Sequence, residues 1–197
     1  KKLLGCWAHA RRKFFEAKVE NEKLALEALS YIRRLYDVEA EADALDAADN
    51  KPDHERRKAL RQERAYPEIK KFETWMEASI LKCPPKSLME EAISYTYKIL
   101  KKLSLYVTDG RYKIDNNMVE NSIRPLAIGR KNYLFCGDDD AAQRAAVVYS
   151  LLATCKAHGV NERAWLEDVL RRIPEYEQAG KDYADLLPGN WSALSAK

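Results

Sequence analysis

Apolar residues recur at three- and four-residue intervals through the first quarter of the chain, which is the spacing of one face of an α-helix. Residues 7–48 contain neither Gly nor Pro, and Ala28, Ile32 and Leu35 follow this spacing. The pattern predicts a long helix over these residues, with a break near Asn21.

Two further helices are predicted before the middle of the chain. A turn at residues 50–52 leads into the first of them, and Pro67 is expected to kink or restart it. Ser87 and Glu90 have the spacing of a capping box, so they predict the start of the next helix. Three such helices predict a small bundle. The apolar stripe of the middle helix comprises Ile69, Phe72, Trp75, Met76 and Ile80.

Charge is segregated between two neighbouring segments. Residues 37–49 hold six acidic and no basic side chains, and a basic run follows. Opposite charges on consecutive helices favour an antiparallel pair, although exposed ion pairs contribute only about 0–1 kcal/mol each. We therefore interpret both runs as solvated helix faces. The basic run comprises Arg56, Arg57, Lys58, Arg61 and Arg64.

The pattern changes at the turn signal Asp109-Gly110, after which the sequence is mixed, polar and basic. Only Leu3–Cys6 and Tyr133–Cys136 have the alternation and residue types of strands. Two strands do not make a large sheet. The fold class predicted from the sequence is therefore mainly α, with little β structure.

The last third of the chain predicts two more helices and a tail. Residues 140–158 are apolar on most sides, so this helix is expected to be central, with Gly159 ending it. Asn161 caps a shorter helix that is expected to end before Pro174. Residues 174–197 are interpreted as an irregular tail. Its anchors are Leu186, Leu187 and Trp191.

Composition excludes several classes of protein. The 197 residues carry a net charge of +3, which does not by itself demand a nucleic-acid partner. The four cysteines are widely spaced, which favours free thiols in a reducing cytoplasm, and no apolar run approaches the ~20 residues of a membrane helix. The chain begins at Lys1 with no helix cap or leader, so we expect it to be a piece of a longer protein. No catalytic Ser-His-Asp order, phosphate-binding Gly loop or dinucleotide motif occurs.

The most unusual window is residues 115–125, Asp-Asn-Asn-Met-Val-Glu-Asn-Ser-Ile-Arg-Pro. Asn117 and Glu120 have the spacing of a helix start, and this is the interpretation that the spacing alone favours. The alternative is chemical, because Asp115 and Glu120 bring carboxylates close to basic residues, as suits a metal ion facing a phosphate backbone. Those basic residues are Arg124, Arg130 and Lys131.

Other candidates carry weaker signals. Cys6 and His9 have a zinc-like spacing, but no second pair of ligands lies at a usual distance along the chain, so zinc is disfavoured. His54 and His158 are isolated and are interpreted as packed or surface residues. The segment around Trp7 is expected to leave a strand and open a helix. Arg11, Arg12 and Lys13 on that helix are available to phosphates.

Four segments together resemble bacterial transposases of the insertion sequence 66 family: residues 5–14 (Gly-Cys-Trp-Ala-His-Ala-Arg-Arg-Lys-Phe), 115–125, 127–137 and 186–191. The resemblance implies a ribonuclease-H-like core with an Asp-Asp-Glu triad, in which Glu120 is the Glu. It also implies that both Asp residues lie upstream, in strands that this chain does not contain. Two positions depart from the family pattern: Asn121 stands where many relatives have Arg, and Gly189 where the tail motif often has Trp.

The resemblance also implies a division of the chain. Residues 1–14 and 109–173 correspond to parts of the catalytic core, residues 15–108 to a helical insertion, and residues 174–197 to a C-terminal tail. Little β structure is expected in any of them.

The function implied by the resemblance is DNA cleavage and strand transfer of an insertion sequence by the intact enzyme. Two Mg²⁺ ions held by the three carboxylates are implied, together with transposon-end and target DNA as partners, a homo-oligomer, and the bacterial cytoplasm. The isolated chain is expected to bind Mg²⁺ weakly, through Glu120, and to cut no DNA. The alternative is a non-catalytic helical module that binds protein or DNA. Phosphate contacts are expected from Arg11, Arg12, Lys13, Arg124, Arg130 and Lys131.

Overall fold

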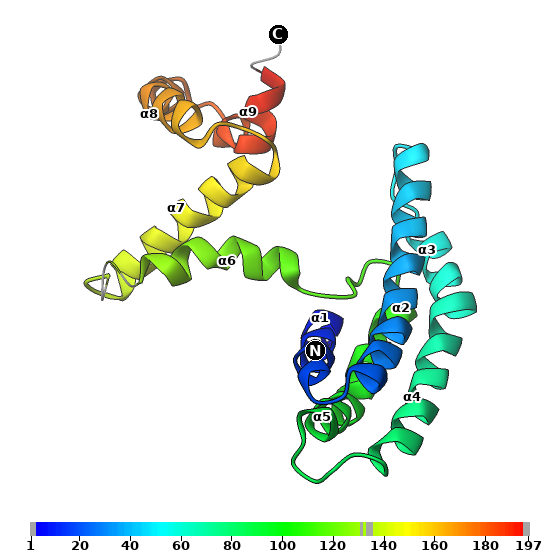
Figure 1. Ribbon diagram of the computed structural model, residues 1–197. Coiled ribbons are helices and arrows are strands. Elements are labelled where there is room, and N and C mark those ends of the chain that lie inside the picture. The colour runs from blue at the N-terminus through cyan, green and yellow to red at the C-terminus, as the bar shows by residue number, and fades with distance from the viewer. Residues whose placement is uncertain (1–2, 131, 133–135, 195–197) are drawn as a thin grey trace. The chain divides into compact units, whose positions relative to one another are not determined.

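The computed structural model of the protein describes residues 3–130, 132 and 136–194 (Figure 1). The chain divides into two compact units, residues 1–118 and residues 119–197. Every regular element among the described residues is helical, so the predicted mainly α fold is confirmed. No described helix combines the length and the apolar character needed to cross a membrane.

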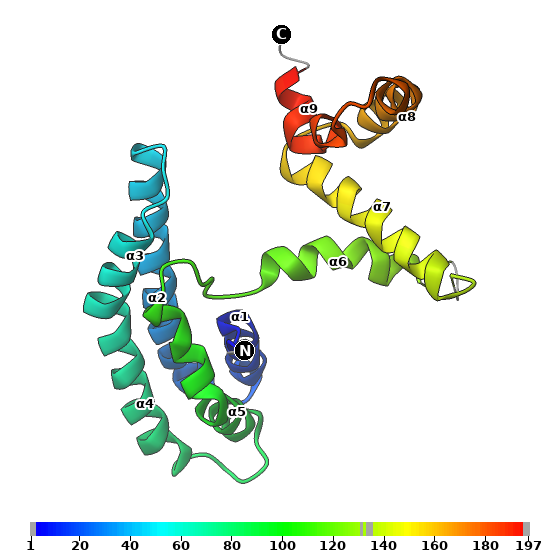
Figure 2. The ribbon, with the colours of Figure 1, turned by 180° about the vertical axis from the view of Figure 1, so that it is seen from behind.

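The first unit is a bundle in which α1 packs against α2 and α5, and α4 packs against both α2 and α5. Figure 1 and its reverse view, Figure 2, show the long helix α2 beside α3 and α4. Its elements are α1 (Trp7–Glu16), the 3₁₀ turn η1 (Ala17–Val19), α2 (Glu22–Ala48), α3 (His54–Leu60), the π-helical turn η2 (Arg61–Ala65), α4 (Tyr66–Ile80), α5 (Leu88–Leu103) and the 3₁₀ turn η3 (Ser104–Thr108).

The ends of these helices follow local sequence signals. Asn21 interrupts the first apolar pattern and its Oδ1 accepts a hydrogen bond from the Leu24 N–H at 3.1 Å, so the predicted break is confirmed. Ser87 Oγ accepts from the Glu90 N–H at 3.2 Å, as the capping box predicted. Pro67 lies in the first turn of α4, which begins at Tyr66 directly after the π-helical turn.

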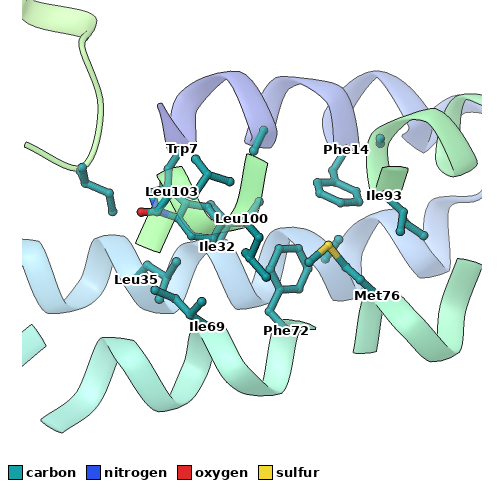
Figure 3. Packing of buried hydrophobic residues seen from close by; sticks show 14 of the residues in the cluster. Trp7, Phe14, Ile32, Leu35, Ile69, Phe72, Met76, Ile93, Leu100 and Leu103 are labelled. Carbon is teal, nitrogen blue, oxygen red and sulfur yellow. The ribbon is translucent and has the colours of Figure 1, made fainter. Parts of the chain in front are cut away.

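The core of the first unit is aromatic and aliphatic (Figure 3). Trp7 is fully buried, and its indole Nε1–H donates to the Leu103 carbonyl oxygen at 3.1 Å, joining α1 to the end of α5. Phe14 and Phe72 meet edge to face with ring centroids 5.7 Å apart, a favoured aromatic geometry. Residues 7–16 therefore pack as part of this bundle rather than as a separate segment.

The charged runs of α2 and of α3 with η2 are solvated only in part. The interpretation as solvated faces holds for most of the acidic run, but it was wrong for Glu39, Arg57 and Arg61, which are buried. Arg61 is fully buried and donates from Nε and Nη2 to the Glu39 carboxylate at 2.7 and 2.6 Å. Its Nη1 donates to the carbonyl oxygens of Tyr106 and Asp109 at 2.9 and 2.8 Å. A buried charge is tolerated only when it is paired and hydrogen-bonded, and packing of α2 against the π-helical turn supplies both.

Arg57 extends this network toward the surface. Its side chain is 8% exposed, and the guanidinium donates to Glu39 at 3.2 Å, to Asp43 at 2.5 Å and to Asp46 at 2.7 Å. The hydrogen bond from Arg57, followed by one from the Asp53 N–H, holds the pKa of Asp46 well below its usual range. Folding thus favours the ionised form of this carboxyl group.

The core of the second unit lies between the C-terminal half of α7 and one side of α8. Trp165 donates from its indole N–H to the Leu186 carbonyl at 2.9 Å, and Trp191 donates to Asp168 at 2.7 Å. Cys155 is buried in the same cluster. The elements are most of α6 (Asn117–Gly129), α7 (Asp139–Ala157), α8 (Glu162–Ala179), the 3₁₀ turn η4 (Tyr183–Leu186) and α9 (Pro188–Leu194).

Two expectations for this region were wrong. Helix α8 does not stop before Pro174 but continues to Ala179, and the segment interpreted as an irregular tail holds the last turns of α8, η4 and α9. Pro174 removes one backbone hydrogen bond, yet Ile173 and Tyr176 on either side of it pack on the Trp165 cluster. Packing therefore holds the helix together through the proline.

Helix α7 is also less central than its composition suggested. Only Cys155 among its residues is buried, while Val147 and Val148 are 59% and 50% exposed. Only its C-terminal half packs in the cluster with α8 and α9.

The predicted strands are not observed where the chain is described. Residues 3–6 have no regular secondary structure, and the Gly5 N–H donates to the Lys102 carbonyl at 3.0 Å. In the second predicted strand, Cys136 has no regular structure and residues 133–135 lie outside the described part of the chain.

Candidate nucleic-acid interface

Glu120 lies in the first turn of α6, with Arg124 one turn later on the same helix. An acidic side chain in a first turn interacts favourably with the helix dipole, so Glu120 also has a local structural role. The Arg124 and Arg130 side chains are exposed, and neither forms an ion pair among the described residues. Lys131 lies outside the described residues. Arg124 and Arg130 therefore present charge to solvent near Glu120 in the sequence.

Helix α6 buries none of its side chains. Its apolar residues are largely solvent-exposed, in contrast to those of α5, where six residues are buried. An isolated helix of this length is only marginally stable in water, so α6 needs another surface to pack against. The exposed apolar residues are Met118, Val119, Ile123 and Ile128, at 74%, 56%, 52% and 58%.

The Asp115 carboxylate is engaged by neighbouring side-chain and backbone donors. Its Oδ2 accepts from the Tyr36 hydroxyl at 2.8 Å and from Asn117 Nδ2 at 3.1 Å, and its Oδ1 accepts from the Asn117 N–H at 3.1 Å. Burial, followed by this hydrogen bond to Asp115, raises the pKa of Tyr36, so the hydroxyl stays a donor. The helix begins at Asn117, where the sequence predicted a helix start, and Asp115 accepts the hydrogen bond from the Asn117 N–H.

The basic residues of α1 have different surroundings. Arg11 and Arg12 are exposed, and neither makes a hydrogen bond or ion pair within the described part of the chain. The Lys13 ammonium lies over the Tyr95 ring, 5.7 Å from its centroid, and is partly engaged there. These three residues belong to the first unit, whereas Arg124 and Arg130 belong to the second. A single surface formed by both groups stays a prediction.

A hollow in the first unit brings Arg11 together with two residues that sequence reasoning did not select, Arg33 and Tyr36, and with Asn117 of the predicted helix start. Arg33 and Tyr36 of α2 and Asn117 at the start of α6 line it together with Arg11. Tyr36 followed the core periodicity of α2, and Arg33 is one of many basic residues on exposed helix positions, so no sequence signal distinguished them. Only the packing of α1 on α2 brings them together.

No described group of three or more His, Cys, Asp or Glu side chains is arranged to hold a metal ion. Mg²⁺ requires near-octahedral oxygen coordination, and Glu120 supplies one carboxylate. The described residues therefore do not form a complete Mg²⁺ site by themselves. Cys6, one of the two residues with zinc-like spacing, precedes α1 as its N-cap residue.

Comparison with known proteins identifies the class of protein to which this arrangement belongs. A family model described as Transposase IS66 family matches residues 1–144, and a second, described as IS66 C-terminal element, matches residues 150–188. The chain is thus a member of a transposase family. It belongs to the IS66 family, as the motifs around Glu120 indicated.

Individual relatives agree with this assignment. The chain is 33% identical over 204 residues to uncharacterized protein y4hP of Sinorhizobium fredii and 38% identical over 191 residues to uncharacterized protein y4qI of the same organism. These alignments cover 97% and 96% of this chain but 35% and 34% of the relatives. The chain therefore spans about a third of their length. No solved structure matches it.

Proposed function

We propose that this chain is part of a DNA transposase that cleaves DNA and transfers strands when the protein is intact. The observation that carries the proposal is the pair of family matches, which together span residues 1–144 and 150–188. Glu120 lies within the first of these ranges. Its place at the start of α6, followed by exposed Arg124 and Arg130, is consistent with a carboxylate beside a phosphate backbone.

In this proposal Glu120 supplies one of three catalytic carboxylates, and two Asp residues outside this chain complete the set. Mg²⁺, when bound by the complete set, supplies the charge stabilisation for phosphodiester chemistry. Because this chain offers one carboxylate of that set, we expect the isolated chain to bind Mg²⁺ weakly and to cut no DNA. Nuclease activity of the purified chain that Glu120→Gln abolishes would contradict this division of the site.

The proposal assigns DNA binding to exposed arginine and lysine side chains. Such residues contact the backbone without reading bases, so duplexes of any sequence should bind with a micromolar or weaker Kd. If about four phosphates are engaged, raising salt from 50 to 200 mM should lower affinity roughly a hundredfold. Assembly into a homo-oligomer belongs to the same proposal. The residues assigned to DNA are Arg11, Arg12, Lys13, Arg124, Arg130 and Lys131.

The decisive experiment is strand transfer by a full-length protein carrying Glu120→Gln. This substitution keeps the shape of the side chain and removes its charge, so we expect strand transfer to be lost while DNA binding is retained. Glu175→Gln in α8 is a matched control, because it makes the same change at an exposed helical position. Strand transfer that survives Glu120→Gln would refute the assignment.

A second candidate function is favoured by the exposed apolar residues of α6. A helix that presents Val119, Ile123 and Ile128 to solvent is a candidate protein-binding surface, because exposed apolar clusters mark such surfaces. Under this alternative the chain is a non-catalytic interaction module. Ile123→Asp would then abolish partner binding, whereas Glu120→Gln would leave every measurable activity intact.

A further inference from the structure

The hollow that contains Arg11 has a volume of about 390 Å³, which lies within the range of small-ligand sites. Two helices and the start of a third form its walls, all within the first unit. Charged and polar groups are placed around an apolar surface. The lining residues are Ala8, Arg11, Leu29, Arg33, Tyr36 and Asn117.

The two guanidinium groups of the hollow are weakly engaged by the protein. Arg11 makes no hydrogen bond or ion pair within the described residues. Arg33 has one acidic neighbour, Asp37, at 4.0 Å, and both side chains are more than 60% exposed. An ion pair this long and this exposed contributes little, so a stronger anion can displace it. Arginine is the side chain best suited to that anion when it is a phosphate, because the guanidinium binds two oxygens at once.

The Asp115 carboxylate is hydrogen-bonded to two residues that line the hollow. It accepts three hydrogen bonds, from the Tyr36 hydroxyl, the Asn117 N–H and the Asn117 side-chain amide. These hydrogen bonds hold the Tyr36 ring against the hollow and set the position of Asn117 at the start of α6.

A second hollow, of about 670 Å³, shows the opposite electrostatic character. Four carboxylates line it, with three basic side chains among them, so it does not favour a phosphate. The acidic residues are already engaged, for example Asp49 with Arg56 and Asp109 with Arg111. Its acidic residues are Asp49, Asp53, Glu55 and Asp109.

We propose that the hollow between α1, α2 and the start of α6 binds one phosphate group of a DNA backbone, held by Arg11 and Arg33. The apolar surface of Leu29 and the Tyr36 ring accommodates the adjoining sugar, which has no charge to pair. This site deepens the proposed function and rests on it. It adds Arg33 to the residues that hold DNA, in a hollow that is also lined by Asn117, three residues before Glu120 in the sequence.

The test is fluorescence anisotropy of a labelled 20-base-pair duplex, titrated with the full 197-residue chain at several salt concentrations. Arg11→Gln with Arg33→Gln should weaken binding about tenfold at 50 mM salt and reduce the slope of log K against log salt by about 0.9, the value of one phosphate contact. Replacing both residues by Lys should retain the slope, because charge is kept, while losing part of the affinity. Circular dichroism of each variant checks folding.

The matched control is Lys101→Gln with Lys102→Gln, which removes two positive charges from exposed positions of α5 in the same unit. It should lower affinity less than the arginine pair. Equal losses from the two double variants would show that only overall charge matters and would overturn the site.

Two further results separate failure of the site from failure of the proposed function. Tight binding of the duplex by the Arg11→Gln and Arg33→Gln variant would overturn the site and leave the transposase proposal standing. No binding by the unmodified chain at 50 mM salt would overturn the site together with the assignment of DNA contacts to this chain, and stabilisation by inorganic phosphate in that case would identify a free-phosphate site instead.

Discussion

Replacing Glu39 by Met tests whether the buried ion network stabilises the first unit. The Glu39 carboxylate is 10% exposed and accepts hydrogen bonds from Arg61 at 2.6 and 2.7 Å and from Arg57 at 3.2 Å. Methionine has similar length and high helix propensity, so the substitution removes the charge with little direct effect on α2. It leaves the fully buried Arg61 guanidinium without an anionic partner.

Removing one partner of a buried ion pair costs about 3–5 kcal/mol, because the remaining charge stays desolvated. Arg61 keeps the carbonyl oxygens of Tyr106 and Asp109 as acceptors, so we expect the lower end of that range, about 3 kcal/mol. With a urea dependence of about 2 kcal/mol per molar, the unfolding midpoint should fall by about 1.5 M.

The assay is urea unfolding followed by tryptophan fluorescence. Trp7 and Trp75 lie in the first unit, whereas Trp165 and Trp191 lie in the second. Substituting the latter two by Phe makes the emission report on the first unit alone. The Glu39→Met variant and its control are then compared in this common background.

Glu41→Met provides the control, because Glu41 lies on the same helix and pairs with Arg64 at the surface, where the two side chains are 43% and 49% exposed. Its loss should cost less than about 1 kcal/mol. Equal midpoints for the Glu39 and Glu41 variants would refute the reasoning. The double variant Glu39→Met with Arg61→Met should recover part of the loss, since no unpaired buried charge remains.

Three further predictions concern single positions in the first unit. Tyr106→Phe should raise the urea midpoint, since the Tyr106 hydroxyl is buried without a hydrogen-bond partner among the described residues. Gly110→Ala should destabilise by about 1–3 kcal/mol, because its Cβ would lie 1.9 Å from the His54 carbonyl oxygen; an unchanged midpoint would contradict this contact. Folding lowers the pKa of Asp46, so its stabilisation is present above about pH 4 and declines as pH falls; Asp46→Asn should flatten the loss of stability measured between pH 4 and 2.

Local sequence signals predicted where the helices begin and end better than they predicted which charged side chains are buried. Asn21, Pro67 and Ser87 act on backbone groups within a few residues, so their effects were readable before the tertiary contacts were known. Pro174 is the exception, because its effect is also local but packing on the Trp165 cluster outweighs it. The expectation that α7 is central was wrong for a related reason. The composition of a helix does not say which half of it packs against other helices.

The candidate site divides in the same way. Glu120 was identified from a contiguous motif, and the family matches agree with that motif. The hollow joins positions far apart in the sequence, among them Arg11, Arg33 and Asn117, so no local pattern predicted it. The hydrogen bond from Tyr36 to Asp115 was equally unpredictable from the sequence, because the two residues are 79 positions apart in the chain.

The sequence by itself determined the helical class, most helix ends and the family, since periodicity, capping residues and contiguous motifs are all local properties. The tertiary structure decided which charges are buried and which residues share a surface. Arg61 and Arg64 lie three positions apart in one basic run, yet one is fully buried against Glu39 and the other is half exposed. That difference arises from the packing of α2 against the π-helical turn, because desolvation depends on neighbours in space rather than in sequence.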